Sequence, residues 1–152
     1  MMHLRRATKA DARTLADLLN AIIATGGTTA MTEPLSRSEM SNWIGSNPAQ
    51  SAVFMAEDDS GTALGFQSIE PHAQLPSDTC NIATFTRSGK TQLGIGSALF
   101  EHSRNAACAL GYRWVNATVL LQNEGGLIYY KSRGFEPYRR TPERLFMRYD
   151  LR

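Results

Sequence analysis

The sequence is poor in cysteine, with only Cys80 and Cys108 among its 152 residues. One lies in a predicted strand and the other in a predicted helix, and their separation fits neither a metal site nor a redox pair. We therefore interpret each as a small buried apolar residue in a reducing compartment, and we expect no metal site.

Charge of one sign and long hydrophobic runs are also lacking. The formal net charge is +2, so nothing demands a nucleic acid or a membrane as partner, although arginines gather toward the end of the chain as a solvated rim or a phosphate-facing patch. No apolar segment approaches the ~20 residues that cross a bilayer. Residues 1–6 carry charge with no apolar run behind them, so we expect no signal peptide and a cytoplasmic protein.

Helical and strand periodicities alternate along the chain, and the length predicts a single domain over residues 1–152. We predict strands at 3–7, 52–57, 63–70, 79–86, 114–121, 135–138 and 145–151. Thr8 and Asp11 have the spacing of a capping box, and the apolar stripe of a first helix follows over 15–23. Further helices are predicted at about 36–44, 94–110 and 124–133. This order indicates an α/β protein with a mixed sheet and helices packed on it.

The strand at 79–86 runs through a short polar loop into a helix that opens at Gly94 and Gly96. Glycines at such a junction let free backbone N–H groups approach an anionic ligand, and the first turn of a helix leaves about four such donors unpaired. A phosphate-bearing cofactor is therefore the leading interpretation.

Two familiar phosphate-binding motifs fail here. Ser88–Thr91 reads as the end of a nucleotide P-loop, but Thr84 stands where the leading glycine is needed. A dinucleotide fingerprint would need a third glycine at the position of Leu99. An NTPase and a dehydrogenase are both disfavoured.

The remaining pattern, Thr91-Gln92-Leu93-Gly94-Ile95-Gly96, resembles the Gln/Arg-x-x-Gly-x-Gly/Ala signature of the GNAT superfamily of acetyl-CoA-dependent N-acetyltransferases. Thr91 departs from it, because the family has Gln or Arg there. A second match is independent: Asn123, Gly126, Tyr130 and Gly134-Phe135 have the spacing of the family's Asn-x-x-(Ala/Ser)-x-x-x-Tyr-x-x-x-Gly-Phe element. The segment from Asn20 through Glu33-Pro34 to Trp43 is similar to the phosphinothricin acetyltransferase-like branch.

The resemblance implies a GNAT-like fold with about six or seven strands and about four helices. It implies acetyl-CoA as co-substrate, a small polar or amino-acid-like amine as acceptor, and a homodimer. The implied cofactor-binding residues are Thr84, Phe85, Thr86, Gln92, Leu93, Gly94, Ile95, Gly96, Ser97, Asn123 and Tyr130. In particular, the pantetheine would pair with the strand at 84–86, a backbone N–H near Thr86 would hold the oxyanion, and Gly126 would make room for the pantetheine arm.

Tyr130 is the expected general acid, since a phenol keeps its proton at neutral pH and can pass it to a departing thiolate. The general base stays open. Related proteins often carry a glutamate where this chain has Asn81, so Glu70, Glu33 in the threonine-rich loop, or a water chain could replace it, and His72 could border the acceptor site. Glu33 is also the candidate substrate-binding residue.

Two other readings compete with an enzyme. A non-catalytic acyl-CoA-binding domain would share the fold and the cofactor, and the departures at Asn81 and Thr91 favour it. A purely structural or protein-interaction domain would not bind coenzyme A at all.

Overall fold

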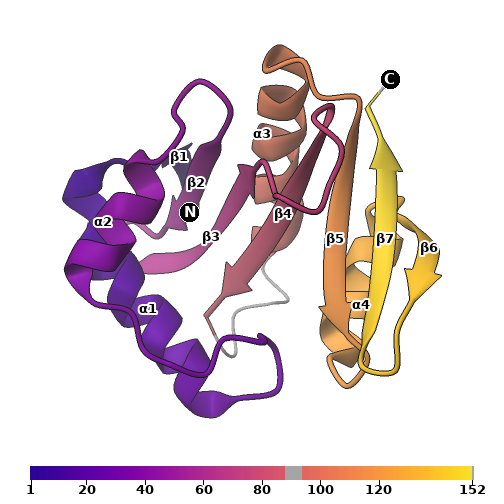
Figure 1. The fold of residues 1–152 in the computed structure, drawn as a ribbon. Helices are drawn as coiled ribbons and strands as arrows, with labels where there is room; N and C mark the ends of the chain where they lie inside the picture. The colour runs from indigo at the N-terminus through magenta and orange to yellow at the C-terminus, as the bar shows by residue number, and fades with distance from the viewer. Residues whose placement is uncertain (88–93, 152) are drawn as a thin grey trace.

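The computed structural model describes residues 1–87 and 94–151. Within them a seven-stranded sheet has the order β1-β2-β3-β4-β5-β7-β6 (Figure 1). Its strands are β1 (His3–Arg6), β2 (Ala52–Glu57), β3 (Ala63–Glu70), β4 (Thr79–Thr86), β5 (Trp114–Leu120), β6 (Glu136–Arg140) and β7 (Arg144–Asp150). β4 and β5 are parallel, and all other neighbouring strands of the described sheet are antiparallel.

Four α-helices accompany the sheet in the described part of the chain: α1 (Ala12–Thr25), α2 (Arg37–Gly45), α3 (Ile95–Ala109) and α4 (Glu124–Ser132), with the 3-10 helix η1 (Lys9–Asp11) before α1. α1 and α2 lie on one side of the sheet, and α3 and α4 lie on the other (Figure 1). The predicted mixed α/β architecture, with its numbers of strands and helices, is confirmed.

Two hydrophobic clusters fill the space between these layers. One contains Phe66 and Phe85 with the buried stripe of α1, and the other contains Ile82 and Val119 with α3 and α4. Because neighbouring residues of a strand point to opposite faces, odd-numbered β4 residues from 81 to 85 face α1 and α2, whereas Ile82 and Thr84 face α3 and α4. This alternation decides which side chains can meet at the site.

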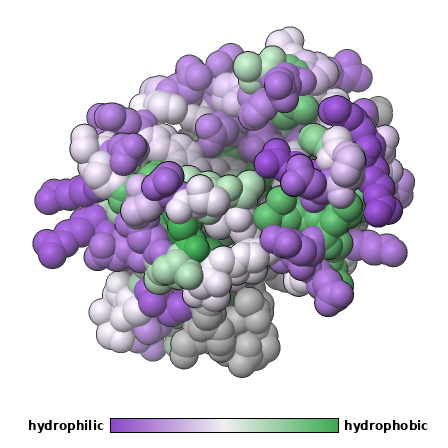
Figure 2. Space-filling model, turned by 60° about the horizontal axis from the view of Figure 1, so that its bottom comes forward, coloured by the Kyte–Doolittle hydropathy of each residue, from purple (hydrophilic) through white to green (hydrophobic). Residues whose placement is uncertain are grey.

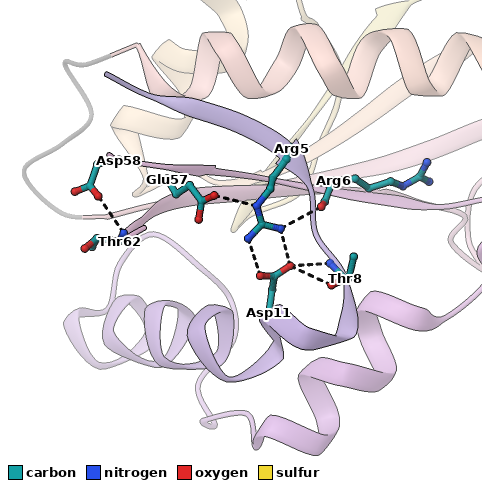
Figure 3. A network of polar contacts seen from close by, with 7 residues as sticks. All are labelled: Arg5, Arg6, Thr8, Asp11, Glu57, Asp58 and Thr62. Carbon is teal, nitrogen blue, oxygen red and sulfur yellow. Dashed lines mark hydrogen bonds and ion pairs between the residues drawn. The ribbon is translucent and has the colours of Figure 1, made fainter. Parts of the chain in front are cut away.

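The first strand is fixed to the rest of the fold by a polar network around Arg5 (Figure 3). The Arg5 guanidinium donates two hydrogen bonds to Asp11, at 2.8 and 2.9 Å, and a third of 2.9 Å to Glu57 on β2. Asp11 also accepts a 2.8 Å bond from the backbone N–H of Thr8, in the predicted capping box. The box caps η1, which then leads into α1.

The cysteine prediction is half wrong. Cys80 is buried in β4, whereas Cys108 is exposed near the end of α3. Position 108 lies off the buried stripe of that helix, which is formed by Leu99, Ser103 and Ala107. Burial raises the pKa of the Cys80 thiol to about 12, so this side chain stays a neutral core residue.

No helix in the described ranges is long and apolar enough to cross a membrane.

Candidate active site

The sheet opens where its two parallel strands separate. β4 continues to Thr86 and β5 to Leu120, but their pairing covers only Thr79–Ile82 with Trp114–Ala117. Beyond that point the two strands diverge (Figure 1). In the described residues, the last four positions of β4 are therefore paired with β3 alone, which leaves an open seam between β4 and β5.

A cavity of about 1300 Å³ follows this seam. It is bordered by the end of α1, the loop after it, β4, β5, the start of α4 and the last two strands. Figure 2 brings the lower side of Figure 1 toward the viewer and shows hydrophobic side chains exposed among hydrophilic ones. A long, partly apolar molecule that binds along a strand edge fits such a space.

The glycine segment at the start of α3 borders the cavity through Gly96. Gly94 is the N-cap of α3 with a φ of +75°, a conformation that favours glycine. Among the described residues that are not its chain neighbours, none has an atom within 4 Å of where a Cβ at Gly94 would be. Ile95 is fully buried, so it can offer only its backbone to a ligand, whereas Ser97 is half-buried and Gly96 lines the cavity. Gln92 and Leu93 lie outside the described residues.

All three predicted β4 residues line the cavity, but their side chains differ in role. Phe85 points toward α2, where its ring stacks on Phe66 at 4.8 Å and meets Trp43 edge-on. Thr84 points the other way, toward α4. Phe85 can therefore contact a bound molecule mainly through its backbone, and Thr84 can also do so through its hydroxyl.

Tyr130 lines the cavity from α4 and is only 7% exposed. Its hydroxyl lies 2.7 Å from Thr84 Oγ1, and its ring packs against Phe135. Burial raises the pKa of Tyr130 above its ordinary value, and the hydrogen bond between Tyr130 and Thr84 partly offsets this rise. The phenol thus remains protonated at neutral pH, as a general acid must.

Tyr129 is a second tyrosine at the cavity that the motif did not identify. Its hydroxyl donates a 2.6 Å hydrogen bond to the carbonyl of Gly96, and it accepts a 3.1 Å bond from the Gln67 amide. A Cβ at Gly96 would lie 2.6 Å from the Tyr129 ring, so the second glycine of the signature makes room for this ring. Burial raises the pKa of Tyr129 as well.

Asn123 caps α4 and connects it to the loop that follows α1. Its Oδ1 accepts a 3.0 Å bond from Gly126 N–H, and its Nδ2 donates a 3.2 Å bond to the carbonyl of Thr28. A Cβ at Gly126 would lie 2.5 Å from that Nδ2 and 3.1 Å from Val119. Gly126 therefore makes room for the Asn123 side chain, where the resemblance led us to expect room for the pantetheine.

The far end of the cavity holds the acidic candidate Glu70, while Glu33 does not reach it. Glu70 lines the cavity and accepts a 2.8 Å bond from Trp43 Nε1. Glu33 is exposed and is not among the lining residues, whereas His72 is exposed and does line the cavity. The structure thus brings Glu70 and His72 together with Tyr130 in one cavity and leaves Glu33 outside.

A buried amide supports the floor of this end. Asn116 is 2% exposed, and its Nδ2 donates 2.9 Å bonds to Asn81 Oδ1 and Thr118 Oγ1. Its Oδ1 accepts a 2.5 Å bond from the Tyr138 hydroxyl, whose pKa is raised by burial. The exposed Arg139 and Arg144 also line the cavity. No group of three metal-ligating side chains occurs in residues 1–87 and 94–151.

Comparison with known proteins found similar chains both in sequence and in structure. No family model matches the chain. The candidate phosphinothricin acetyltransferase YwnH of Bacillus subtilis is 26% identical over 156 residues, which cover 99% of this chain and 96% of that protein.

Solved structures agree with this sequence match. A GNAT superfamily phosphinothricin acetyltransferase from Sinorhizobium meliloti, in complex with acetyl-CoA, has a TM-score of 0.88 at 20% identity. The match covers 99% of this chain and 88% of the Sinorhizobium protein. The candidate acetyltransferase yncA from Salmonella typhimurium, with its cofactor acetyl-CoA, has a TM-score of 0.89 at 18% identity. That match covers 100% of this chain and 95% of yncA. The structural likeness shows that this chain has the GNAT fold, and the sequence match shows that it is similar to a candidate phosphinothricin acetyltransferase.

Proposed function

We propose that this protein transfers the acetyl group of acetyl-CoA to the primary amine of a small, amino-acid-like molecule. The observation that carries the proposal is the open seam between β4 and β5, with the Tyr130 hydroxyl on one face of the sheet and the Glu70 carboxylate on the other. Both side chains line one cavity, so an acid and a base can act on opposite sides of a thioester bound there.

Coenzyme A, as a substrate, fits the residues that are present. The unpaired end of β4 can hydrogen-bond an extended pantetheine arm as an added strand would. The N-terminus of α3, opened by Gly94, offers backbone N–H groups and a partial positive charge to the pyrophosphate. A backbone N–H near Thr86 is our candidate for holding the oxyanion.

The nucleophile must be a neutral amine. An alkyl amine of pKa ~10.4 is only about one part in ~2,500 neutral at pH 7, so a base or a desolvating pocket is required. Of the alternatives that the sequence left open, the geometry favours Glu70, because its carboxylate lines the cavity and is oriented by Trp43. Attack then proceeds directly within a ternary complex, without an acyl-enzyme.

The cavity lining carries charges of both signs, from Glu70 on β3 and from Arg139 and Arg144 on the last two strands. An arginine can bind a carboxylate, and a carboxylate can bind an amine, so such a lining suits a molecule that carries both groups. This arrangement supports an amino-acid-like acceptor.

The second candidate is a non-catalytic acyl-CoA-binding domain, which the amide at Asn81 favours because related proteins carry a glutamate there. The homodimer and the cytoplasmic location stay predictions.

Thiol release from acetyl-CoA, measured over a panel of amino acids and polyamines, tests the proposal. We expect release only with an acceptor, and we expect amines that carry a carboxylate to react best. Each amine needs a blank without acetyl-CoA, because the exposed Cys108 also reacts with thiol reagents. Thermal stabilisation by coenzyme A with no release for any amine would identify a binding domain, and no stabilisation at all would contradict both readings.

A further inference from the structure

Four side chains and one carbonyl form a continuous hydrogen-bond chain between α3 and the seam. From its α3 end, the Gly96 carbonyl is 2.6 Å from the Tyr129 hydroxyl, which is 3.1 Å from Gln67 Nε2. The same nitrogen is 2.9 Å from Thr84 Oγ1, which is 2.7 Å from the Tyr130 hydroxyl. Gln67 and Thr84 are direct partners in the β3–β4 register and share the face toward α4.

The contact between Gly96 and Tyr129 decides which group donates in each of these hydrogen bonds. A carbonyl oxygen can only accept, so the 2.6 Å contact with Gly96 uses the single proton of the Tyr129 hydroxyl. The Tyr129 oxygen must then accept from Gln67, which requires the amide to present its NH₂ group. The same NH₂ group faces Thr84, so Thr84 Oγ1 also accepts from Gln67 and keeps its own proton free for Tyr130.

We propose that Gln67, Thr84 and Tyr129 are positioning residues that direct the Thr84 hydroxyl proton at the oxygen of Tyr130, so that the proton of Tyr130 is free for the departing thiolate. The inference rests on the proposed function, since it takes Tyr130 as the general acid. Its effect appears in the transfer step, when the phenol becomes a phenolate. A hydrogen bond donated to the charged form stabilises that form, and a buried oxyanion without donors is costly.

Burial makes this support necessary. Gln67 is fully buried, and its Oε1 finds no hydrogen-bond partner among the described residues. A reversed amide would give Oε1 the Thr84 proton, but it would also set two acceptors against each other at Tyr129. Oε1 is therefore left unsatisfied because the Gln67 amide is oriented with its NH₂ group toward Tyr129 and Thr84.

The protons balance in this scheme. The Tyr130 O–H bond breaks and an S–H bond forms on coenzyme A, while the Thr84 proton stays on Thr84 and only strengthens its hydrogen bond. The amine nitrogen loses one proton to the base as the amide forms. Tyr130 regains a proton through water when the products leave, so the net reaction moves one proton from the amine to the thiol.

Removing the Thr84 hydroxyl tests the proposal. We expect Thr84→Val to lower kcat about ten-fold while KM for acetyl-CoA changes less than about three-fold, because the donor to the phenolate is lost and the backbone of β4 is kept. Thr84→Ser should recover most of the loss. Thr79→Val is the matched control on the same strand, since Thr79 is buried and contacts Asp78 outside the cavity; it should keep kcat.

A double-mutant cycle separates this inference from the proposed function. In a Tyr130→Phe background, Thr84→Val should cause no further loss of kcat, because its effect acts through the phenol. An undiminished ten-fold loss in that background would overturn the inference and leave the acetyltransferase intact. Wild-type turnover of Tyr130→Phe alone would instead contradict the acid assignment of the proposed function.

Tyr129→Phe provides a second variant in case Thr84→Val folds poorly. Without the Tyr129 hydroxyl, the Gln67 amide is free to reverse and to draw the Thr84 proton away from Tyr130. We expect a kcat loss of about three-fold or more that again disappears in the Tyr130→Phe background. Unchanged kcat in Tyr129→Phe would show that Tyr129 does not orient the Gln67 amide and the Thr84 hydroxyl, which would overturn its part in the inference.

Discussion

Glu70 lies directly opposite Asn81 in the antiparallel pair of β3 and β4. Directly opposed residues point to the same face of a sheet, with Cβ atoms about 4.5–5.5 Å apart. In the proposed function, Glu70 would take the place of the glutamate that the resemblance implies at position 81, because it lies on the neighbouring strand at the same level of the sheet. Trp43 Nε1 fixes its orientation with a 2.8 Å hydrogen bond.

Glu70→Gln should therefore lower kcat with the preferred amine by about 10²-fold, the usual size of a general-base contribution. Glu33→Gln is the parallel variant, since Glu33 is exposed outside the cavity, and it should change kcat less than about two-fold. Steady-state thiol release at saturating acetyl-CoA measures both. A larger loss of kcat in Glu33→Gln than in Glu70→Gln would indicate that the acceptor amine binds at the loop after α1 and not beside Glu70.

The register also predicts a partial rescue. Adding Asn81→Glu to Glu70→Gln restores a carboxylate on the same face, so kcat should recover by about ten-fold. The rescue would be incomplete, because Asn81 Oδ1 accepts a bond from the buried Asn116 amide. No recovery in a folded double variant would argue that the carboxylate acts on the acceptor from the position of Glu70 alone.

Tyr130→Phe should lower turnover by about 10²-fold or more and keep acetyl-CoA binding, because it removes a proton donor and leaves the ring in its packing. Thermal shift with coenzyme A measures the binding. Burial raises the pKa of Tyr130, so the wild-type acid should stay protonated, and kcat should not fall through its ionisation up to about pH 9. A fall of kcat near pH 8 that disappears in Tyr130→Phe would contradict a raised pKa of Tyr130.

Local pattern was enough to predict most of the fold. The strands at 52–57, 63–70 and 79–86 have the predicted bounds, because alternation and turn residues mark both ends of each. Errors fall where tertiary packing decides. Cys108 reads as a core residue, but the turn of α3 places it on the exposed side. At the last hairpin, β6 begins one residue late and extends two residues farther, because β7 pairs with it.

The site was predictable only where residues lie close in the sequence. The spacing of Asn123, Gly126 and Tyr130 on one helix is visible without a structure. Gln67 was missed because only the β3–β4 register places it opposite Thr84. Tyr129 was missed because the motif names its neighbour, although two adjacent tyrosines before a glycine were a signal that could have been followed.

Two neighbouring glycines of α4 should respond in opposite directions to alanine. Among the described residues, apart from its chain neighbours and the backbone of its own helix, only Asn123 Oδ1, at 3.9 Å, lies within 4 Å of a Cβ built at Gly125. Gly125→Ala should therefore raise the free energy of unfolding by about 0.5–1 kcal/mol through helix propensity. Gly126→Ala should lower it by about 1 kcal/mol or more, because its Cβ would displace the capping side chain of Asn123. Urea unfolding compares the two variants. Stabilisation by both would show that Asn123 moves aside without cost.

The polar network at the first strand predicts how stability depends on pH. Arg5, through its hydrogen bonds, lowers the pKa of Asp11 below its ordinary 3.8, so the folded protein holds the carboxylate more firmly than the unfolded chain does. A lowered folded pKa contributes stability that is fully present above about pH 4 and is lost as the pH falls through the folded value. The contribution is modest, since the Arg5 side chain is 42% exposed and solvent screens the pair.

Asp11→Asn should accordingly lower the free energy of unfolding at pH 7 by about 1 kcal/mol, and the difference from wild type should shrink as the pH falls from about 4 to 2. Asp59→Asn is the matched control, because Asp59 forms ion pairs with His3 and the N-terminus but is 69% exposed. It should leave the melting temperature almost unchanged, since exposed pairs contribute little. Equal losses in the two variants, or a loss in Asp11→Asn that persists undiminished at pH 2, would show that the charge on Asp11 is not what fixes β1 to η1.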